Sequence, residues 1–220
     1  MAGSEYWRLR AEMVRRYTRQ GYLCSPRLME AMRRVPREMF VEGRFADLAY
    51  QDRPIPIPHS RGDWTPQAYQ YPLFVEPLDL REGDTILEVG TGSGYGAAIA
   101  REMVGERGRV VTLEVDGEAY AFAISCLAKA GYTDVIVVNA DGVNGCPEMS
   151  PFDKICVTVA CETVPEELMR QLKRPGLLIA PVGSASGLGG QALTLFKMHE
   201  DGEVTKETLG RVVCSPLREE

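Results

Sequence analysis

Short runs of branched apolar residues alternate with amphipathic segments along the middle of the chain. The runs predict strands at 85–89, 109–116, 134–141, 152–160 and 176–183. Helical patterns lie between them: from the glycine-rich segment to about Val104, over 118–130, and over 165–172. This alternation is typical of a parallel sheet with helices on both faces, so we expect a doubly wound α/β fold.

The flanking segments follow different patterns. Residues 4–20 predict an amphipathic helix, and Ser25-Pro26 begins a second helix that ends before Pro36. Between 49 and 72 the chain carries five prolines, three tyrosines and a tryptophan without periodicity, which predicts an ordered loop. The segment 183–190, GSASGLGG, predicts a flexible loop, and the tail predicts antiparallel strands that turn at Asp201-Gly202.

With 220 residues, the chain can bury one enzyme-sized α/β core. We therefore expect a single domain, 1–220. Its predicted parts are the N-terminal helices with the proline-rich loop (1–80), a core (81–183) and C-terminal strands (184–220).

Charge and cysteine content exclude several classes of protein. The formal net charge of −6 leaves no basic surplus for a phosphate backbone, so no nucleic-acid partner is expected. No run approaches the ~20 apolar residues of a membrane span and no secretory signal is evident, so we expect a cytoplasmic protein without a membrane partner, and a monomer. The six cysteines lack the spacing of a zinc site, and no metal is expected.

Three glycines, each two residues from the next, follow the strand at 85–89. Gly90, Gly92 and Gly94 lie where a strand turns into a helix, and bare backbone there lets a ligand approach closely. The spacing departs from the dinucleotide pattern G-x-G-x-x-G, and the phosphate loop G-x-x-x-x-G-K-[ST] is absent. The pattern therefore favours another nucleotide-like cofactor.

Acidic residues end three successive strands. Glu88 lies in the first, Glu114 ends the second, where it could accept both ribose hydroxyls, and Asp141 ends the third, where it could accept an adenine amino group. Together with the glycines, these acids resemble the S-adenosylmethionine site of Rossmann-like methyltransferases. The residues expected to bind this cofactor are Glu88, Gly90, Thr91, Gly92, Ser93, Gly94, Glu114, Val115, Asp141 and Gly142. The alternative is that the glycines only close a tight turn and the acids only cap strand ends.

Longer motifs narrow the resemblance. The segments are VPREMFV (35–41), LAYQDRPIPI (48–57), LEVGTGSGY (87–95), FDKICVTVA (152–160), LKRPGLLIAPVG (172–183) and a tail containing CSPL. In order and over nearly the whole chain, they resemble the protein-L-isoaspartate O-methyltransferase family. The resemblance implies that a methyl group passes from S-adenosylmethionine to the free carboxylate of isoaspartyl residues in damaged proteins or peptides.

This chemistry agrees with the scarcity of histidine, since only His59 and His199 are present. A carboxylate nucleophile with an ordinary pKa near ~4 is ionised at neutral pH and requires no general base. The protein then has to align the reacting groups and exclude water.

Some residue roles come only from the family resemblance. Thr65 aligns with a hydroxyl residue that contacts the acceptor carboxylate, and is the catalytic candidate. Trp64 and Thr158 are the substrate-binding candidates. The alternative for Thr65 is a hydroxyl that caps a turn before Pro66. Asp63 stands where the family has threonine and would repel an acceptor carboxylate.

Two further readings stay open because of this altered segment, DWTPQAY (63–69). The chain could methylate an ordinary aspartate in a dedicated peptide, or it could bind the cofactor without catalysis.

Overall fold

The computed structural model describes residues 3–184 and 189–217. The predicted flexible loop at 183–190 thus falls partly outside the described residues. Within those two ranges, no helix is both long and apolar enough to cross a membrane.

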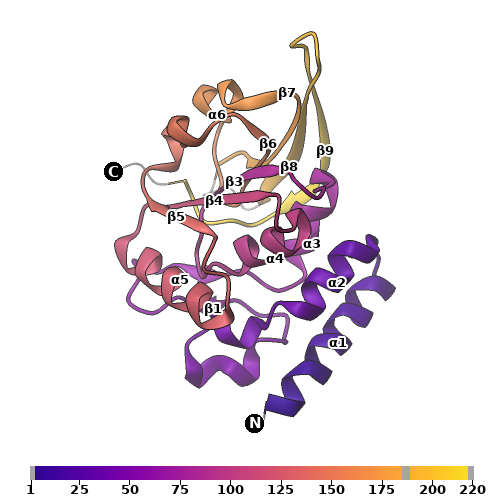
Figure 1. The fold of residues 1–220 in the computed structure, drawn as a ribbon, viewed down its shortest axis with the longest axis vertical. Helices are drawn as coiled ribbons and strands as arrows, with labels where there is room; N and C mark the ends of the chain where they lie inside the picture. The colour runs from indigo at the N-terminus through magenta and orange to yellow at the C-terminus, as the bar shows by residue number, and fades with distance from the viewer. Residues whose placement is uncertain (1–2, 185–188, 218–220) are drawn as a thin grey trace.

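A seven-stranded sheet forms the centre of the molecule, in the order β5-β4-β3-β6-β7-β8-β9 (Figure 1). Its first five strands are parallel, whereas β8 and β9 are antiparallel to their neighbours. The strands are β3 (Thr85–Val89), β4 (Arg109–Glu114), β5 (Ile136–Asn139), β6 (Phe152–Val157), β7 (Leu172–Val182), β8 (Gln191–Met198) and β9 (Val204–Val212). The predicted doubly wound, Rossmann-like sheet with C-terminal antiparallel strands is confirmed.

Helices cover both faces of this sheet. They are α1 (Gly3–Arg19), α2 (Pro26–Arg34), α3 (Gln70–Val75), α4 (Tyr95–Val104), α5 (Gly117–Ala130) and α6 (Glu166–Arg170). Because successive strand residues face opposite sides, Ile86 joins a core shared with α1, α2 and α4, whereas the next residue, Leu87, joins a core that includes Leu168 of α6. This two-sided burial explains why the strands are almost continuously apolar.

The N-terminal helices pack as a pair on the α4 side of the sheet (Figure 1). Met13 and Tyr17 of α1 are fully buried, which confirms the apolar face predicted from the sequence. The Ser25 hydroxyl accepts a hydrogen bond from the amide of Leu28 and caps α2, as Ser25-Pro26 predicted. A short 3-10 helix, η1 (Arg37–Phe40), follows and leads the chain toward the proline-rich segment.

Tertiary pairing moves several predicted boundaries. Strand β7 begins at Leu172, because that residue pairs with Phe152 of β6, and this pairing ends α6 earlier than predicted. The predicted loop at 49–72 contains a two-stranded hairpin, β1 (Ile55–Pro56) with β2 (Trp64–Thr65), and its last residues enter α3. The turn at Asp201-Gly202 is confirmed: the Gly202 amide donates to the His199 carbonyl between β8 and β9.

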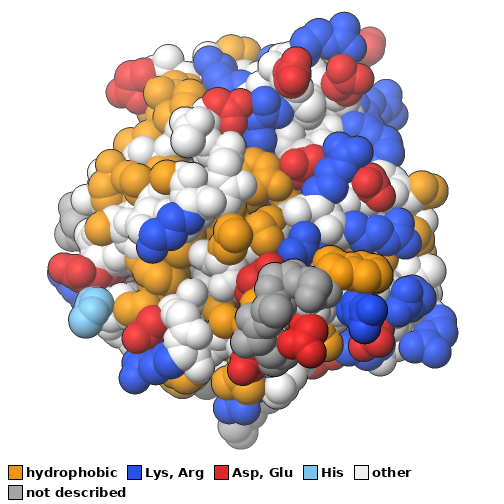
Figure 2. Space-filling view, turned by 60° about the horizontal axis from the view of Figure 1, so that its bottom comes forward, with side chains coloured by type: hydrophobic (Ala, Val, Ile, Leu, Met, Phe, Trp, Pro, Cys, Tyr) orange, Lys and Arg blue, Asp and Glu red, His pale blue; other side chains and the backbone are white. Residues whose placement is uncertain are grey.

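Charged side chains of both signs are intermixed over much of the surface seen in Figure 2, and hydrophobic side chains gather over another part of the same face. No single-sign field therefore dominates this view, in keeping with the modest net charge.

Candidate functional site

The glycine loop turns the chain from β3 into α4. The amides of Gly90 and Thr91 both donate to the Leu113 carbonyl of β4, at 2.9 and 3.1 Å. Gly90 has a φ of +96°, and a Cβ atom there would lie 2.5 Å from Oγ1 of Thr158. Glycine is thus required at position 90 by the protein's own packing, independently of any ligand.

Glu114 stands at the end of β4, with its carboxylate held by the main chain. Oε2 accepts from the Gly92 amide at 2.8 Å, and Oε1 accepts from the Asp116 amide at 3.1 Å. Burial raises the pKa of the Glu114 carboxyl, and the hydrogen bonds from these two amides oppose that rise. Each carboxylate oxygen retains further acceptor capacity, so the group is oriented but can still accept from a ligand.

Glu88 of β3 lies deeper and is only 6% exposed. The Thr112 hydroxyl donates to its Oε2 at 2.7 Å, and Oγ1 of Thr91 lies 2.7 Å from Oγ1 of Thr112. Burial raises the pKa of Glu88 to about 8, with the Thr112 hydrogen bond opposing this rise and the charge of Glu114 adding to it. A Cβ atom at Gly96 would lie 2.3 Å from Oε1 of Glu88, so this glycine makes room for the carboxyl.

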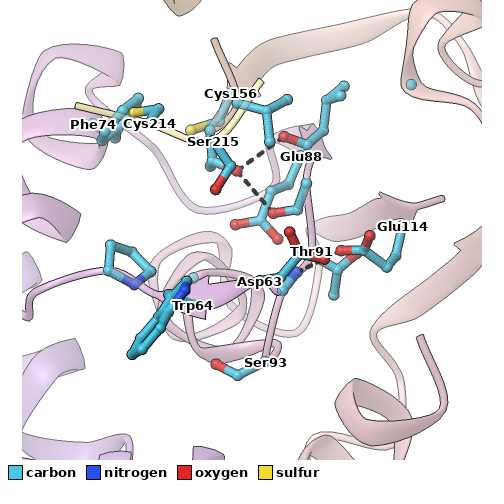
Figure 3. Close-up of a pocket in the computed structure, with 18 of the residues that line it drawn as sticks. Asp63, Trp64, Phe74, Glu88, Thr91, Ser93, Glu114, Cys156, Cys214 and Ser215 are labelled. Carbon is cyan, nitrogen blue, oxygen red and sulfur yellow. Dashed lines mark hydrogen bonds between the residues drawn. The ribbon is translucent and has the colours of Figure 1, made fainter. Parts of the chain in front are cut away.

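A cavity of about 330 Å³ opens at the carboxyl ends of β3, β4 and β6. Its wall includes three acidic side chains, Asp63, Glu88 and Glu114, which Figure 3 shows around the same space. No lysine or arginine is among the described residues that line it. The volume is that of a small-molecule site, and the charge of its wall favours a cationic ligand.

The predicted glycine-loop residues meet at this cavity. Gly90, Thr91, Gly92 and Ser93 line it, as does Val115 after β4. Gly94 does not line it and instead caps α4 in a left-handed conformation, packed against Leu127.

Asp141 lies next to the cavity but not in its wall. Its Oδ1 accepts from the Val143 amide at 2.9 Å and caps the short 3-10 helix η4 (Gly142–Asn144). The neighbours Ala140 and Gly142 line the cavity instead. The structure therefore brings the predicted Gly142 to the site, whereas the Asp141 carboxylate, expected to contact adenine, is used for capping.

The hairpin β1–β2 forms the outer wall. Adjacent residues of a strand point to opposite sides, and here Trp64 lines the cavity, whereas Thr65 is buried behind it at 1% exposure. The Thr65 hydroxyl donates to the Ile55 carbonyl across the hairpin at 3.2 Å. The geometry therefore does not bring the predicted catalytic hydroxyl to the cavity, because the strand register turns it inward.

Contacts beyond the hairpin hold this wall close to α5. The amide of Ile57 donates to the Asp63 carbonyl at 2.9 Å, and the Arg61 amide donates to Oδ2 of Asp116 at 3.1 Å. Asp116 also caps α5 by accepting from the Glu118 and Ala119 amides. The wall segment and the N-terminus of α5 therefore share one anchoring carboxylate, that of Asp116, whose own amide donates to Glu114.

Thr158, which follows β6, also lines the cavity. Its hydroxyl lies 3.0 Å from the Val89 carbonyl and 2.8 Å from the Gly90 carbonyl, so it braces the glycine loop. The predicted substrate-binding residues Trp64 and Thr158 thus lie in the wall of the same cavity.

Sequence reasoning missed one part of the wall. The C-terminal segment 213–217 lines the cavity, held by hydrogen bonds from the Ala160 amide to the Ser215 carbonyl and from the Leu217 amide to the Ala160 carbonyl, both 2.7 Å. The CSPL motif was the only sequence signal for it. Tyr71 of α3 also lines the cavity; the sequence leaves open whether the aromatic residues Tyr50, Trp64, Tyr69 and Tyr71 form a substrate-binding rim or anchor the loop, and of these Trp64 and Tyr71 line the cavity.

A doubly wound sheet with a glycine loop after β3 and acids at the ends of β3 and β4 defines a Rossmann-like fold of the methyltransferase class. Comparison with known proteins narrows this class. Residues 8–220 match the family model "Protein-L-isoaspartate(D-aspartate) O-methyltransferase (PCMT)". The chain belongs to this family.

Individual relatives agree over almost the full length. The chain is 41% identical to a protein-L-isoaspartate O-methyltransferase of Ignicoccus hospitalis, over 95% of this chain and 97% of the relative. It is 40% identical to one from Methanopyrus kandleri, over 96% and 91%.

Among solved structures, a protein-L-isoaspartate O-methyltransferase superimposes with a TM-score of 0.81 at 30% identity, over 94% of this chain and 65% of that chain. A Plasmodium falciparum protein solved with S-adenosyl-L-homocysteine shares the fold, with a TM-score of 0.82 at 19% identity, over 96% and 99%.

Proposed function

We propose that this protein is an enzyme that transfers a methyl group from S-adenosylmethionine to the free carboxylate of L-isoaspartyl residues in damaged proteins or peptides. The observation that carries this proposal is the acid-lined cavity at the carboxyl ends of β3 and β4, in a chain that belongs to the isoaspartate methyltransferase family over 8–220. The reaction is the first step of a repair route, because the ester can close to a succinimide that reopens partly to normal aspartate.

The wall of the cavity fits the cofactor chemically. S-adenosylmethionine carries a sulfonium and an ammonium group, and the cavity wall contains the acidic residues Asp63 and Glu114 without a competing cation among the described lining residues. Glu88, whose pKa is raised to about 8, adds negative charge as it ionises. Glu114, already oriented by two amides, would accept the ribose hydroxyls. Gly142 and Ala140 offer bare or small wall positions for the base. When bound, the cofactor supplies a methyl group activated by the sulfonium.

Methylation of a carboxylate requires little proton transfer by the protein. A carboxylate acceptor is ionised at neutral pH, so no general base is needed. Trp64 and Thr158, which both line the cavity, would position the acceptor. The Thr65 hydroxyl, bonded to the Ile55 carbonyl, would support the hairpin rather than contact the acceptor. Catalysis would then rest on alignment and on shielding the reacting groups from water.

A second candidate substrate is an ordinary aspartate in a dedicated peptide. The observation that favours it is Asp63 in the cavity wall, beside the position at which an acceptor carboxylate would enter. Like charges in a partly desolvated site disfavour each other, so this wall could select an acceptor whose own surroundings carry positive charge.

One experiment separates these candidates. The protein is incubated with methyl-labelled S-adenosylmethionine and matched peptides that differ only in an isoaspartyl or aspartyl linkage. Base-labile label on the isoaspartyl peptide alone supports repair, and label on the aspartyl peptide alone supports tailoring. Cofactor binding by calorimetry without label on either peptide would instead indicate a binding protein without catalysis.

We further propose that the chain works as a single-domain monomer in the cytoplasm. Support for one domain comes from the continuous sheet that joins the core strands to β8 and β9. All six cysteines are free thiols, which suits a reducing compartment. Light scattering coupled to size exclusion would test the monomer, and fractionation of the source cells would test the location.

A further inference from the structure

We propose that Arg37 is a positioning residue for the acceptor: it ties both ends of the segment 49–66 so that this segment forms the outer wall of the cavity. This inference rests on the proposed methyltransferase function. Arg37 itself is not among the residues that line the cavity.

The tie consists of two hydrogen bonds to main-chain carbonyls. Arg37 is 1% exposed, and its Nε donates to the Ala49 carbonyl at 2.7 Å, whereas Nη2 donates to the Pro66 carbonyl at 2.8 Å. Ala49 and Pro66 bracket the hairpin that carries Trp64. One rigid, planar side chain thus closes the segment at its base, which restricts where the hairpin can lie.

The same guanidinium also lies over two aromatic rings. Its central carbon lies 5.3 Å from the ring centre of Tyr71 and 4.9 Å from that of Tyr95. The two rings meet edge to face, with centres 4.8 Å apart. Since Tyr71 lines the cavity, Arg37 contacts a second wall element as well. A lysine could not reproduce the hydrogen bonds to two carbonyls together with the contacts to two rings.

The cost of this arrangement argues for a positional role. Burying a cation is expensive unless an anion balances it, yet none of the ion pairs among residues 3–184 and 189–217 involves Arg37. The Arg37 guanidinium instead contacts neutral carbonyl groups and aromatic rings. An apolar side chain would fill a core position at lower cost, so what Arg37 specifically adds is the fixed distance between Ala49 and Pro66.

The chain offers a matched control. Arg27 of α2 also donates to two main-chain carbonyls, those of Leu80 and Met103, but it joins segments away from the cavity wall. Arg27 is exposed, unlike Arg37, so Arg27→Met controls for the loss of a pair of main-chain hydrogen bonds outside the segment 49–66 but not for the loss of a buried side chain. Any effect common to Arg27→Met and Arg37→Met reports general stability rather than positioning.

The test compares Arg37→Lys, Arg37→Met and Arg27→Met, all in a Trp7→Phe background, so that Trp64 is the only tryptophan. We expect both Arg37 variants to raise the KM for an isoaspartyl peptide at least tenfold, with the Kd for S-adenosylmethionine changed less than twofold. Trp64 anisotropy should fall and acrylamide quenching of its fluorescence should rise in both. Arg27→Met should leave the peptide KM and both Trp64 signals at the level of the background protein.

Several results would overturn the proposal. One is an unchanged peptide KM with unchanged Trp64 signals in a folded Arg37 variant; another is full rescue by lysine, which would assign the role to charge alone. Parallel loss of cofactor binding, or failure of both Arg37 variants to fold, would make Arg37 a general stabiliser. If the background protein methylates no isoaspartyl peptide, the proposed function fails. That failure can be told apart from failure of the Arg37 proposal, because the Trp64 signals still report whether Arg37 holds the segment 49–66.

Discussion

The most informative prediction concerns Glu88. Ionisation of its buried carboxyl should lower the stability of the folded protein but strengthen cofactor binding. Burial raises its pKa from 4.5 to about 8. At 1.36 kcal/mol for each pH unit, the ionised form is disfavoured in the folded protein by up to about 5 kcal/mol. The folded state therefore holds the proton more tightly than the unfolded chain between those two pH values, and stability falls as pH rises through this window.

The perturbation is Glu88→Gln, which keeps the shape and the ability to accept from Thr112 but cannot ionise. At pH 5 the variant should be about as stable as the wild type. At pH 8.5 it should be more stable by roughly 2–5 kcal/mol, the upper limit being the full cost of ionisation. Urea unfolding at both pH values measures the difference.

Cofactor binding should respond in the reverse sense. The cationic groups of S-adenosylmethionine favour an ionised Glu88, and with a pKa of about 8 only about one tenth of the protein is ionised at pH 7. The apparent affinity at pH 7 should therefore be roughly tenfold weaker than at alkaline pH. Calorimetry in two buffers of different ionisation enthalpy should detect release of nearly one proton in the wild type and none from this site in Glu88→Gln.

The variant also serves as the control, since the ligand's own ionisation affects both proteins equally. The reasoning is refuted if the stability difference between the two proteins does not change from pH 5 to 8.5, or if both release the same number of protons.

Three further predictions follow from single contacts. Glu114→Ala should weaken cofactor binding by roughly 1.5–3 kcal/mol, as expected for hydrogen bonds to a charged group; an unchanged Kd in calorimetry would place the ribose elsewhere. Thr65→Val should lower the free energy of unfolding by about 1 kcal/mol, the usual value of one buried hydrogen bond, with kcat near the wild-type value; a large fall in kcat at unchanged stability would return the hydroxyl to the mechanism. Gly90→Ala should destabilise the protein by more than the roughly 1 kcal/mol expected for Gly131→Ala, because both have positive φ but only position 90 meets Oγ1 of Thr158; equal costs in thermal unfolding would contradict this packing argument.

Several parts of the site follow from local sequence because local chemistry decides them. The strand at 85–89, the turn at Gly90 and the helix after Gly94 depend on apolar patterning and on left-handed backbone, both visible in the sequence. Parallel strands end at one edge of a sheet, so the pattern also predicts that Glu88 and Glu114 lie close together. The cavity contains both.

Other features depend on side-chain direction, which local patterns leave open. Trp64 and Thr65 are neighbours in a loop without periodicity, and only the pairing of Ile55 with Thr65 decides that the tryptophan faces the cavity and the hydroxyl faces inward. Asp141 lies two residues beyond the end of β5, and its carboxylate caps η4. A one-residue change of register would have reversed the first outcome.

The sequence by itself determined the order of strands and helices, the glycine loop and the acidic edge, because each depends on residues near one another in the chain. Only the tertiary structure decided what encloses that edge. Residues from 49–66, Tyr71 and the segment 213–217 meet there, and Arg37, which does not line the cavity, contacts the first two. These contacts join residues far apart in sequence. Such contacts depend on how packed elements fill space, and composition and periodicity do not specify that.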